Sequence, residues 1–289
     1  MYKRYYDIDV DAKAYANRIV KAGGRIPSDI GSVSDFIKKL KINGLWIDLV
    51  DCWLMRSIHN IGTGTTLYSL KNNQFNATLT NGPTWESSGI NFSSANCGAF
   101  FNNFSNLMLG DGYTISYIPA FLSKTVSTAY FGIIGFTNNS SLSHYDHSPV
   151  QVRIYFDATS HNITIDLMEK SIDRNAEIRE FPNMISNNYH MLTFSKQCFG
   201  SYTSLMYRNG ISKTAYSVGS GGNPPPKLND MDTQDLNVDL TSTIFRNYGS
   251  VFTGLKNSAT FLHKRALTAA EHVIFYNIVK STIGKGVVI

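Results

Sequence analysis

Residues 205–215 of this 289-residue chain read Leu-Met-Tyr-Arg-Asn-Gly-Ile-Ser-Lys-Thr-Ala, and this stretch decides the fold. Asn209 and Gly210 stand between two short runs with the composition of half-buried β-strands. Both residues of a two-residue hairpin turn must accept positive φ angles, which asparagine and glycine tolerate best. The stretch therefore predicts a β-hairpin that turns at Asn209 and Gly210.

Further strands are expected on both sides of this hairpin. Residues 191–195 alternate between two faces, and residues 258–264 have the composition of another strand. The second of these leads into residues 266–271, where Thr268 and Glu271 have the spacing of a capping box. We therefore expect a short helix to follow the closing strand.

Short strand-like runs also recur through the middle of the chain. Residues 85–92, 113–117 and 131–136 are expected to be strands, and residues 150–156 and 162–168 are expected to form a hairpin. Clusters of turn residues separate them. Many short strands divided in this way indicate a β-sandwich and not alternating βαβ units.

The order of these motifs resembles the second half of a laminin G-like, or concanavalin A-like, jelly roll. Residues 191–194, 205–211 and 265–271 match the strand, the Asn-Gly hairpin and the Arg-Ala-Leu-Thr-Ala-Ala-Glu segment of such domains. The resemblance covers residues 67–278 and implies a mainly β fold, a jelly-roll sandwich. One fold serves many activities, so these motifs specify the fold better than the function.

The first 62 residues have a helical pattern instead. Asp9 or Asp11 can cap a first helix, and Ser32 or Ser34 can begin a second helix that ends at Asn43-Gly44. The chain is thus expected to divide into a small helical N-terminal region, residues 1–62, and a jelly roll with a short C-terminal helix, residues 63–289.

Residues 45–54 are expected to form a third helix, with Trp53 on its main apolar stripe and Trp46 and Leu54 beside it. That apolar face is too wide for an isolated helix. It must pack against the other helices, against the jelly roll or against a neighbouring subunit. Trp46, Trp53 and Leu54 are therefore candidates for an assembly interface.

The helical region also carries a resemblance. Its pattern is Asp9-x-Asp11-Ala12-x-Ala14-Tyr15, then Val33-x-x-Phe36-Ile37-x-x-Leu40-Lys41, then Gly44-Leu45-Trp46. It resembles a helical leader that precedes the same type of jelly roll in structural proteins of tailed bacteriophages. This resemblance implies a non-enzymatic virion component of the capsid, tail, baseplate or fibre, made in the bacterial cytoplasm. Its expected partners are other virion proteins, further copies of the chain and host-surface polysaccharide.

Jelly rolls of this type include glucanases, so a polysaccharide-degrading glycoside hydrolase is the alternative. Such enzymes place their acids on one face of one strand. Asp166 and Glu169 are three residues apart and so face opposite sides of a strand, with no third acid in register. We therefore expect no catalytic residues, unless acids from distant strands meet.

Two loops hold the candidate binding residues. Tyr145 and Asp146 lie in a His-Tyr-Asp-His cluster that fits an exposed loop better than a metal site. Residues 219–235 combine glycines, three prolines and acids, and this oxygen-rich loop could bind carbohydrate or Ca²⁺, or simply connect two strands. The candidates in the second loop are Asn229, Asp230, Asp232 and Asp235. No cofactor is expected, with Ca²⁺ in this loop as the alternative.

Composition excludes several other classes. The net charge of +5 comes without a dense block of lysine and arginine, so no nucleic-acid partner is expected. No apolar run reaches a membrane-spanning length or follows the first charges as a secretory signal would, so no membrane partner is expected. The three cysteines form no C-x-x-C pair, which argues against a disulfide framework or structural zinc.

Overall fold

The computed structural model describes the protein over most of both ends and over the strands of its middle. The described residues are 7–94, 97–102, 112–120, 123–124, 128–131, 135–137, 150–157, 163–169, 175–179, 188–197, 204–213, 215–218, 241–246 and 252–288.

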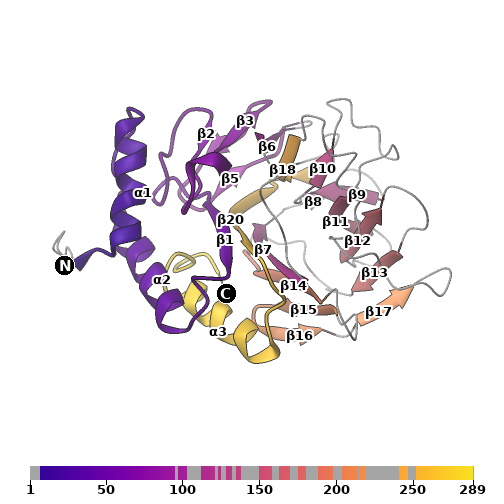
Figure 1. Ribbon diagram of the computed structural model, residues 1–289. Coiled ribbons are helices and arrows are strands. Elements are labelled where there is room, and N and C mark those ends of the chain that lie inside the picture. Colours follow the sequence, from indigo (N-terminus) through magenta and orange to yellow (C-terminus); the bar gives the residue numbers. More distant parts are fainter. Residues whose placement is uncertain are drawn as a thin grey trace, which may run out of the picture.

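Two large antiparallel sheets make up most of the molecule (Figure 1). The first sheet has the strand order β16-β15-β14-β7-β20-β5-β4, and β1 also pairs with β20. Its strands are β1 (Leu49–Leu54), β4 (Thr84–Trp85), β5 (Ile90–Asn91), β7 (Gly112–Ala120), β14 (Leu192–Gln197), β15 (Ser204–Arg208), β16 (Ile211–Lys213) and β20 (Lys256–His263). The expected mainly β architecture is confirmed.

The second sheet has the order β17-β13-β12-β11-β10-β18-β6-β3-β2, and β9 also pairs with β11. Its strands are β2 (Thr66–Leu67), β3 (Ala77–Thr80), β6 (Gly98–Asn102), β9 (Thr128–Phe131), β10 (Gly135–Thr137), β11 (Val150–Asp157), β12 (Ile163–Glu169), β13 (Asn175–Arg179), β17 (Ala215–Val218) and β18 (Thr241–Arg246). The short strands β8 (Ser123–Lys124) and β19 (Phe252–Thr253) pair separately, and a 3-10 turn, η2 (Asn73–Phe75), precedes β3.

The hairpin predicted at Asn209 and Gly210 is confirmed, because it joins β15 to β16 and both residues have positive φ angles, 52° and 73°. A side chain at Gly210 would meet the ring of Tyr276 at 2.8 Å. Tyr276 belongs to α3 (Ala269–Ser281), whose predicted capping box between Thr268 and Glu271 is also confirmed. The hairpin therefore packs closely against the C-terminal helix.

The two N-terminal helices form as predicted, with one difference at a cap. Asp9 caps α1 (Val10–Lys21) by accepting a hydrogen bond from the backbone of Asp11. The second helix, α2 (Ile30–Ile42), begins earlier than expected, because Asp29 caps it by accepting from the backbone N–H of Ser32.

The third helix predicted over residues 45–54 is wrong, because β1 occupies residues 49–54 and pairs antiparallel with β20. Both faces of this strand are covered, so nearly every position needs a buried residue. A short, wholly buried apolar run cannot be distinguished from a buried helix by periodicity. The region before residue 62 therefore contributes a strand to the jelly-roll sheet as well as two helices.

Burial in β1 also corrects the proposed assembly interface. Trp53 is 0% exposed and its indole Nε1 donates to the carbonyl of Phe75 at 2.7 Å. Leu54 is buried in the core between the sheet and the helices, and Trp46 is half-buried against the same core. Trp53 and Leu54 thus pack within the chain and present no surface to a neighbouring subunit.

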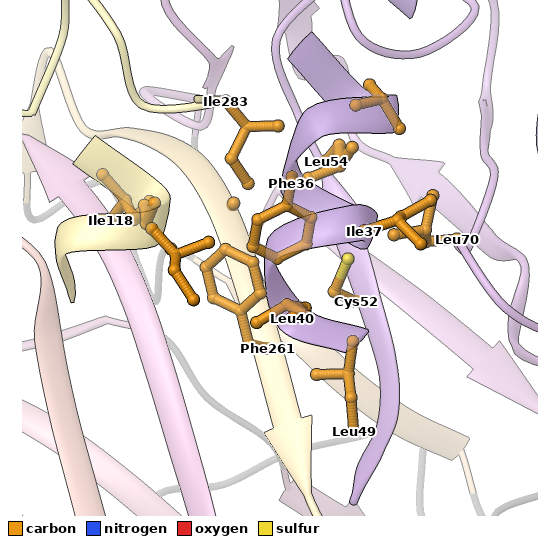
Figure 2. Close-up of a cluster of buried hydrophobic side chains, with 14 of the residues drawn as sticks. Phe36, Ile37, Leu40, Leu49, Cys52, Leu54, Leu70, Ile118, Phe261 and Ile283 are labelled. Atoms are coloured by element: carbon orange, nitrogen blue, oxygen red, sulfur yellow. The ribbon is translucent and has the colours of Figure 1, made fainter. Parts of the chain in front are cut away.

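The main core lies between the helices and the outer face of the first sheet (Figure 2). Phe261 of β20 is its centre. The Phe261 ring lies 5.8 Å from that of Phe36 in α2 and 5.2 Å from that of Phe275 in α3. The helices and the sheet therefore share one hydrophobic core.

Replacing Phe261 with alanine should lower the free energy of unfolding by about 3–5 kcal/mol, because it leaves a cavity between two helices and a sheet. Urea unfolding of the full chain measures this loss. Ile42→Ala is the matched control, because Ile42 is 82% exposed and its loss should change stability by no more than about 0.5 kcal/mol. A loss below about 1 kcal/mol for Phe261→Ala would contradict the shared core.

Candidate functional site

Most residues predicted for binding fall outside the described part of the chain: Tyr145, Asp146, Asn229, Asp230, Asp232 and Asp235 all lie there. Asp166 and Glu169 are in β12, where they pair in register with Arg153 and Val150 of β11. The antiparallel pairing predicted for these two strands is thus confirmed, while the turn predicted at residues 158–161 lies outside the described part of the chain. The side chains of β12 are not among those described.

A buried polar layer stands out within the described residues, where α3 covers the first sheet. We call it the hydroxyl–histidine layer, and it consists of Thr114, Ser116, Ser195, His263 and His272. Strand register builds it, because Thr114 of β7 lies directly opposite Ser195 of β14 on one side and His263 of β20 on the other. His272 comes from α3. Three neighbouring strands and one helix thus place polar side chains in one interior space.

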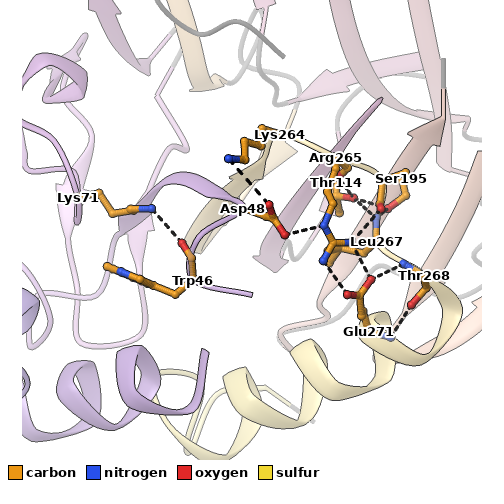
Figure 3. Close-up of polar contacts among 11 residues, drawn as sticks. Trp46, Asp48, Lys71, Thr114, Ser195, Lys264, Arg265, Leu267, Thr268 and Glu271 are labelled. Carbon is orange, nitrogen blue, oxygen red and sulfur yellow. Dashed lines mark hydrogen bonds and ion pairs between the residues drawn. The ribbon is translucent and has the colours of Figure 1, made fainter. Parts of the chain in front are cut away.

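Two hydroxyl groups in this layer hold the turn between β20 and α3 (Figure 3). The backbone N–H of Leu267 donates to Thr114 Oγ1 at 2.9 Å and to Ser195 Oγ at 3.2 Å. Thr114 Oγ1 donates to the carbonyl of Arg265 at 2.9 Å, and the two hydroxyls also hydrogen-bond to each other. The turn therefore has its backbone polar groups satisfied by the sheet, as buried backbone groups require.

An ion-pair network holds the same turn from outside. Arg265 Nε donates to Asp48 Oδ2 at 2.6 Å, and its two terminal nitrogens donate to the Glu271 carboxylate at 2.6 and 2.8 Å. The paired geometry matches a guanidinium to a carboxylate. Hydrogen bonds from Arg265 lower the pKa of Glu271 to about 2. The Arg-Ala-Leu-Thr-Ala-Ala-Glu segment thus connects β20 to α3, and its first and last residues are joined by an ion pair.

Ser195 and His272 lie close enough to be considered as a nucleophile and its base, since Ser195 Oγ is 2.9 Å from His272 Nε2. Such a pair also needs a group that orients the base and access for a substrate. His272 Nδ1 has no partner among the described residues, and the two residues are only 1% and 2% exposed. The Tyr207 ring stacks on His272 at 4.0 Å. We therefore assign this pair to the packing of α3 on the first sheet.

Both histidines of the layer are neutral at pH 7. Burial, followed by the charge of Arg265, lowers the pKa of His263 to about 3. Burial lowers the pKa of His272 to about 4, partly opposed by Glu271. A buried imidazolium would lose its hydration with no carboxylate in contact, so the neutral form is favoured.

A second buried centre anchors β1. The carboxylate of Asp51 accepts hydrogen bonds from the backbone N–H groups of Cys52, Lys71 and Asn72 at 2.7, 2.9 and 3.0 Å. Burial raises its pKa to about 6, and these N–H groups oppose that effect. Asp51 therefore fastens residues 71–72 to the edge of the first sheet.

Sequence reasoning missed both buried centres. Thr114 and Ser195 alternate with the apolar Tyr113 and Phe194 along their strands, which is also the pattern of a strand with one face in solvent. The only available signal was the position of His272 directly after the capping box.

Within the described ranges, no group of three or more histidines, cysteines or acids is arranged to hold a metal ion. The helices found there are too short or too polar to cross a membrane.

Replacing Arg265 with alanine should lower the free energy of unfolding by about 1–2 kcal/mol, because two carboxylates lose a partly buried partner. Thermal and urea unfolding measure the change. Lys264→Ala is the matched control, because Lys264 reaches Asp48 only at 4.0 Å and is half exposed. The control should change stability by no more than about 0.5 kcal/mol. Equal effects of the two substitutions would show that the network does not hold the turn.

Comparison with known proteins supports the architecture. No family model and no curated protein matches the chain. Among solved structures, a Trypanosoma rangeli sialidase in complex with sialic acid is similar with a TM-score of 0.53 and 10% identity, over 83% of this chain and 34% of the sialidase. The receptor-binding domain of a botulinum neurotoxin C/D mosaic serotype is similar with a TM-score of 0.52 and 13% identity, over 80% of this chain and 51% of that domain. The binding domain of botulinum neurotoxin serotype D matches with the same values. The chain thus spans well under two thirds of each, and these similarities show a β-sandwich fold.

Proposed function

We propose that this protein is a non-enzymatic structural component of a tailed-phage virion, whose laminin G-like jelly roll binds host-surface glycan. The observation that supports this proposal is that the described helices lie on one side of the molecule. In Figure 1, the three helices lie along the first sheet and away from strands β9–β13 of the second sheet. One side can then attach to the particle while the other faces outward.

The attachment side follows from the corrected interface. Since Trp53 and Leu54 are buried, attachment must use other side chains of the helical region. Ile42 and Ile47, on either side of the turn at Gly44, are 82% and 73% exposed. Exposed apolar patches can mark protein–protein contacts, and we assign these two side chains to such a contact. The partner proposed is another virion protein, with further copies of this chain alongside.

Cryo-electron microscopy of the phage particles should find the chain with its helices against another virion protein. Ile42→Asp/Ile47→Asp should reduce the amount of protein incorporated at least tenfold, because two charges would be buried at the contact. Ile211→Asp is the matched control, because Ile211 is 63% exposed on the β15–β16 hairpin. It should incorporate normally. Absence of the chain from the particle would refute the virion role, and normal incorporation of the double variant would refute this attachment side.

Glycan binding is supported by the fold similarity to a sialidase solved with sialic acid. Sialylated glycans are therefore the first class to test, with host-surface polysaccharide beside them. The loop residues 145–146 and 229–235 remain the sequence-based candidates for contact. We expect an array of such glycans to retain the purified chain and Asp230→Ala/Asp232→Ala to weaken retention. Calcium dependence would place a cation in that loop, and no retention with or without calcium would refute the binding role.

A polysaccharide-degrading hydrolase is the second candidate, favoured by the same similarity to sialidases. The carboxylate of Asp166 or of Glu169 would be one of its acids, paired with an acid from another strand. Incubation of the chain with host polysaccharide should release no sugar if the structural role is correct. Release that disappears in Asp166→Asn/Glu169→Gln would establish the enzyme instead.

A further inference from the structure

Several polar atoms of the hydroxyl–histidine layer lack a hydrogen-bond partner in the described part of the chain. Both ring nitrogens of His263, Nδ1 of His272 and the hydroxyl of Ser116 have no hydrogen-bond partner among the described residues. Buried polar atoms are paired in the great majority of native structures. These unpaired atoms are concentrated where α3 packs on the first sheet, a contact that we call the seam. Burying them without partners lowers the stability of this contact.

The two histidines sit on opposite sides of that seam. His263 belongs to β20 and meets the ring of Phe275 edge-on at 4.9 Å. His272 belongs to α3 and lies between Ser195 and the Tyr207 ring. A proton added to either ring would therefore place a charge between the helix and the sheet.

The surrounding charges do not stabilise such protons. His263 is faced by Arg265 at the end of β20, by Lys71 and by His272 across the seam, all of which oppose a positive charge. Glu271 is the acid that favours it, but its carboxylate is already engaged by Arg265. Asp48 is likewise engaged by Arg265. Among the described residues, each histidine would thus be charged without an acid that is free to pair with it.

We propose that α3 and the residues after it form an acid-released clasp, in which protonation of His263 and His272 frees the helix while the sheet stays folded. The sheet retains its own backbone ladder when the helix leaves, because β7, β14 and β20 pair with one another. Release uncovers the apolar contacts of Phe275 with Phe261.

The sign of the pH dependence follows from linkage. The pKa values of about 3 and about 4 in the attached state lie below the ordinary value of 6.5, so the released state binds more protons. Attachment is therefore fully stable above pH 6.5 and weakens as the pH falls toward 4. Between pH 7 and pH 5, the opening equilibrium should increase by roughly 500-fold if the released histidines titrate normally.

Two further buried histidines lie outside this seam. His59 contacts Asp29 at 3.2 Å and therefore has a counter-ion close by. His190 lies beside Asn209 at 3.1 Å and Arg208 at 3.4 Å, near the hairpin. Arg208 and burial both disfavour its protonation. His190 is thus a suitable control, since it is buried and neutral but does not separate α3 from β20.

Hydrogen–deuterium exchange of the full chain tests the clasp. After correction for intrinsic exchange rates, protection of residues 269–281 should fall by a few hundredfold from pH 7 to pH 5, while protection of β7 and β14 falls far less. His263→Leu/His272→Gln should abolish this difference, because leucine fills the apolar site and glutamine can still hydrogen-bond to Ser195. His190→Gln should retain it. An equal fall in all elements, no fall at α3, or an unchanged response in the double variant would overturn the proposal.

A second measurement needs no variant. Histidine ring resonances in the wild-type chain should show two residues that stay neutral until the pH at which α3 loses its protection. Titration of both near pH 6.5 with α3 still protected would also overturn the proposal.

Discussion

The fold depends on how the last strand turns into the last helix. At that turn, the backbone N–H of Leu267 would be buried without a partner if Thr114 and Ser195 did not accept it. These hydroxyls come from two strands that are distant in sequence from the turn. One set of hydrogen bonds therefore fixes the start of α3 above β7, β14 and β20, which pair with one another through their backbones.

The position of β20 has consequences for the whole first sheet. It pairs with β7, β1 and β5, so it joins the strand contributed by the N-terminal region to the strands of the jelly roll. Its Phe261 side chain then brings α2 and α3 together on the outer face. Phe261 thus couples the helices to the sandwich, together with core residues of β1 and β7 such as Leu54 and Ile118. Among the described residues, helices α1, α2 and α3 lie away from strands β9–β13 of the second sheet, and the proposed attachment and binding sides rest on this asymmetry.

Local signals in the sequence were sufficient for the local features. The positive φ angles at Asn209 and Gly210 and the box between Thr268 and Glu271 follow from the chemistry of those residues alone. Tertiary features were not predictable in this way. β1 looked like a helix because a strand buried on both faces loses its alternation. The contact between Thr114 and Leu267 spans 153 positions. The spacing of apolar residues within one strand or helix cannot predict a hydrogen bond between segments so far apart. The candidate binding loops remain predictions from sequence.

A double-mutant cycle between Thr114 and Ser195 tests the central claim most directly. Thr114→Val, Ser195→Ala and the combined variant would be compared with the wild-type chain by urea unfolding. If both hydroxyls hold the closing turn together, the two losses of stability should be non-additive by at least about 1 kcal/mol. Additive losses, within about 0.3 kcal/mol, would show that the two hydroxyls act independently and do not hold the closing turn together.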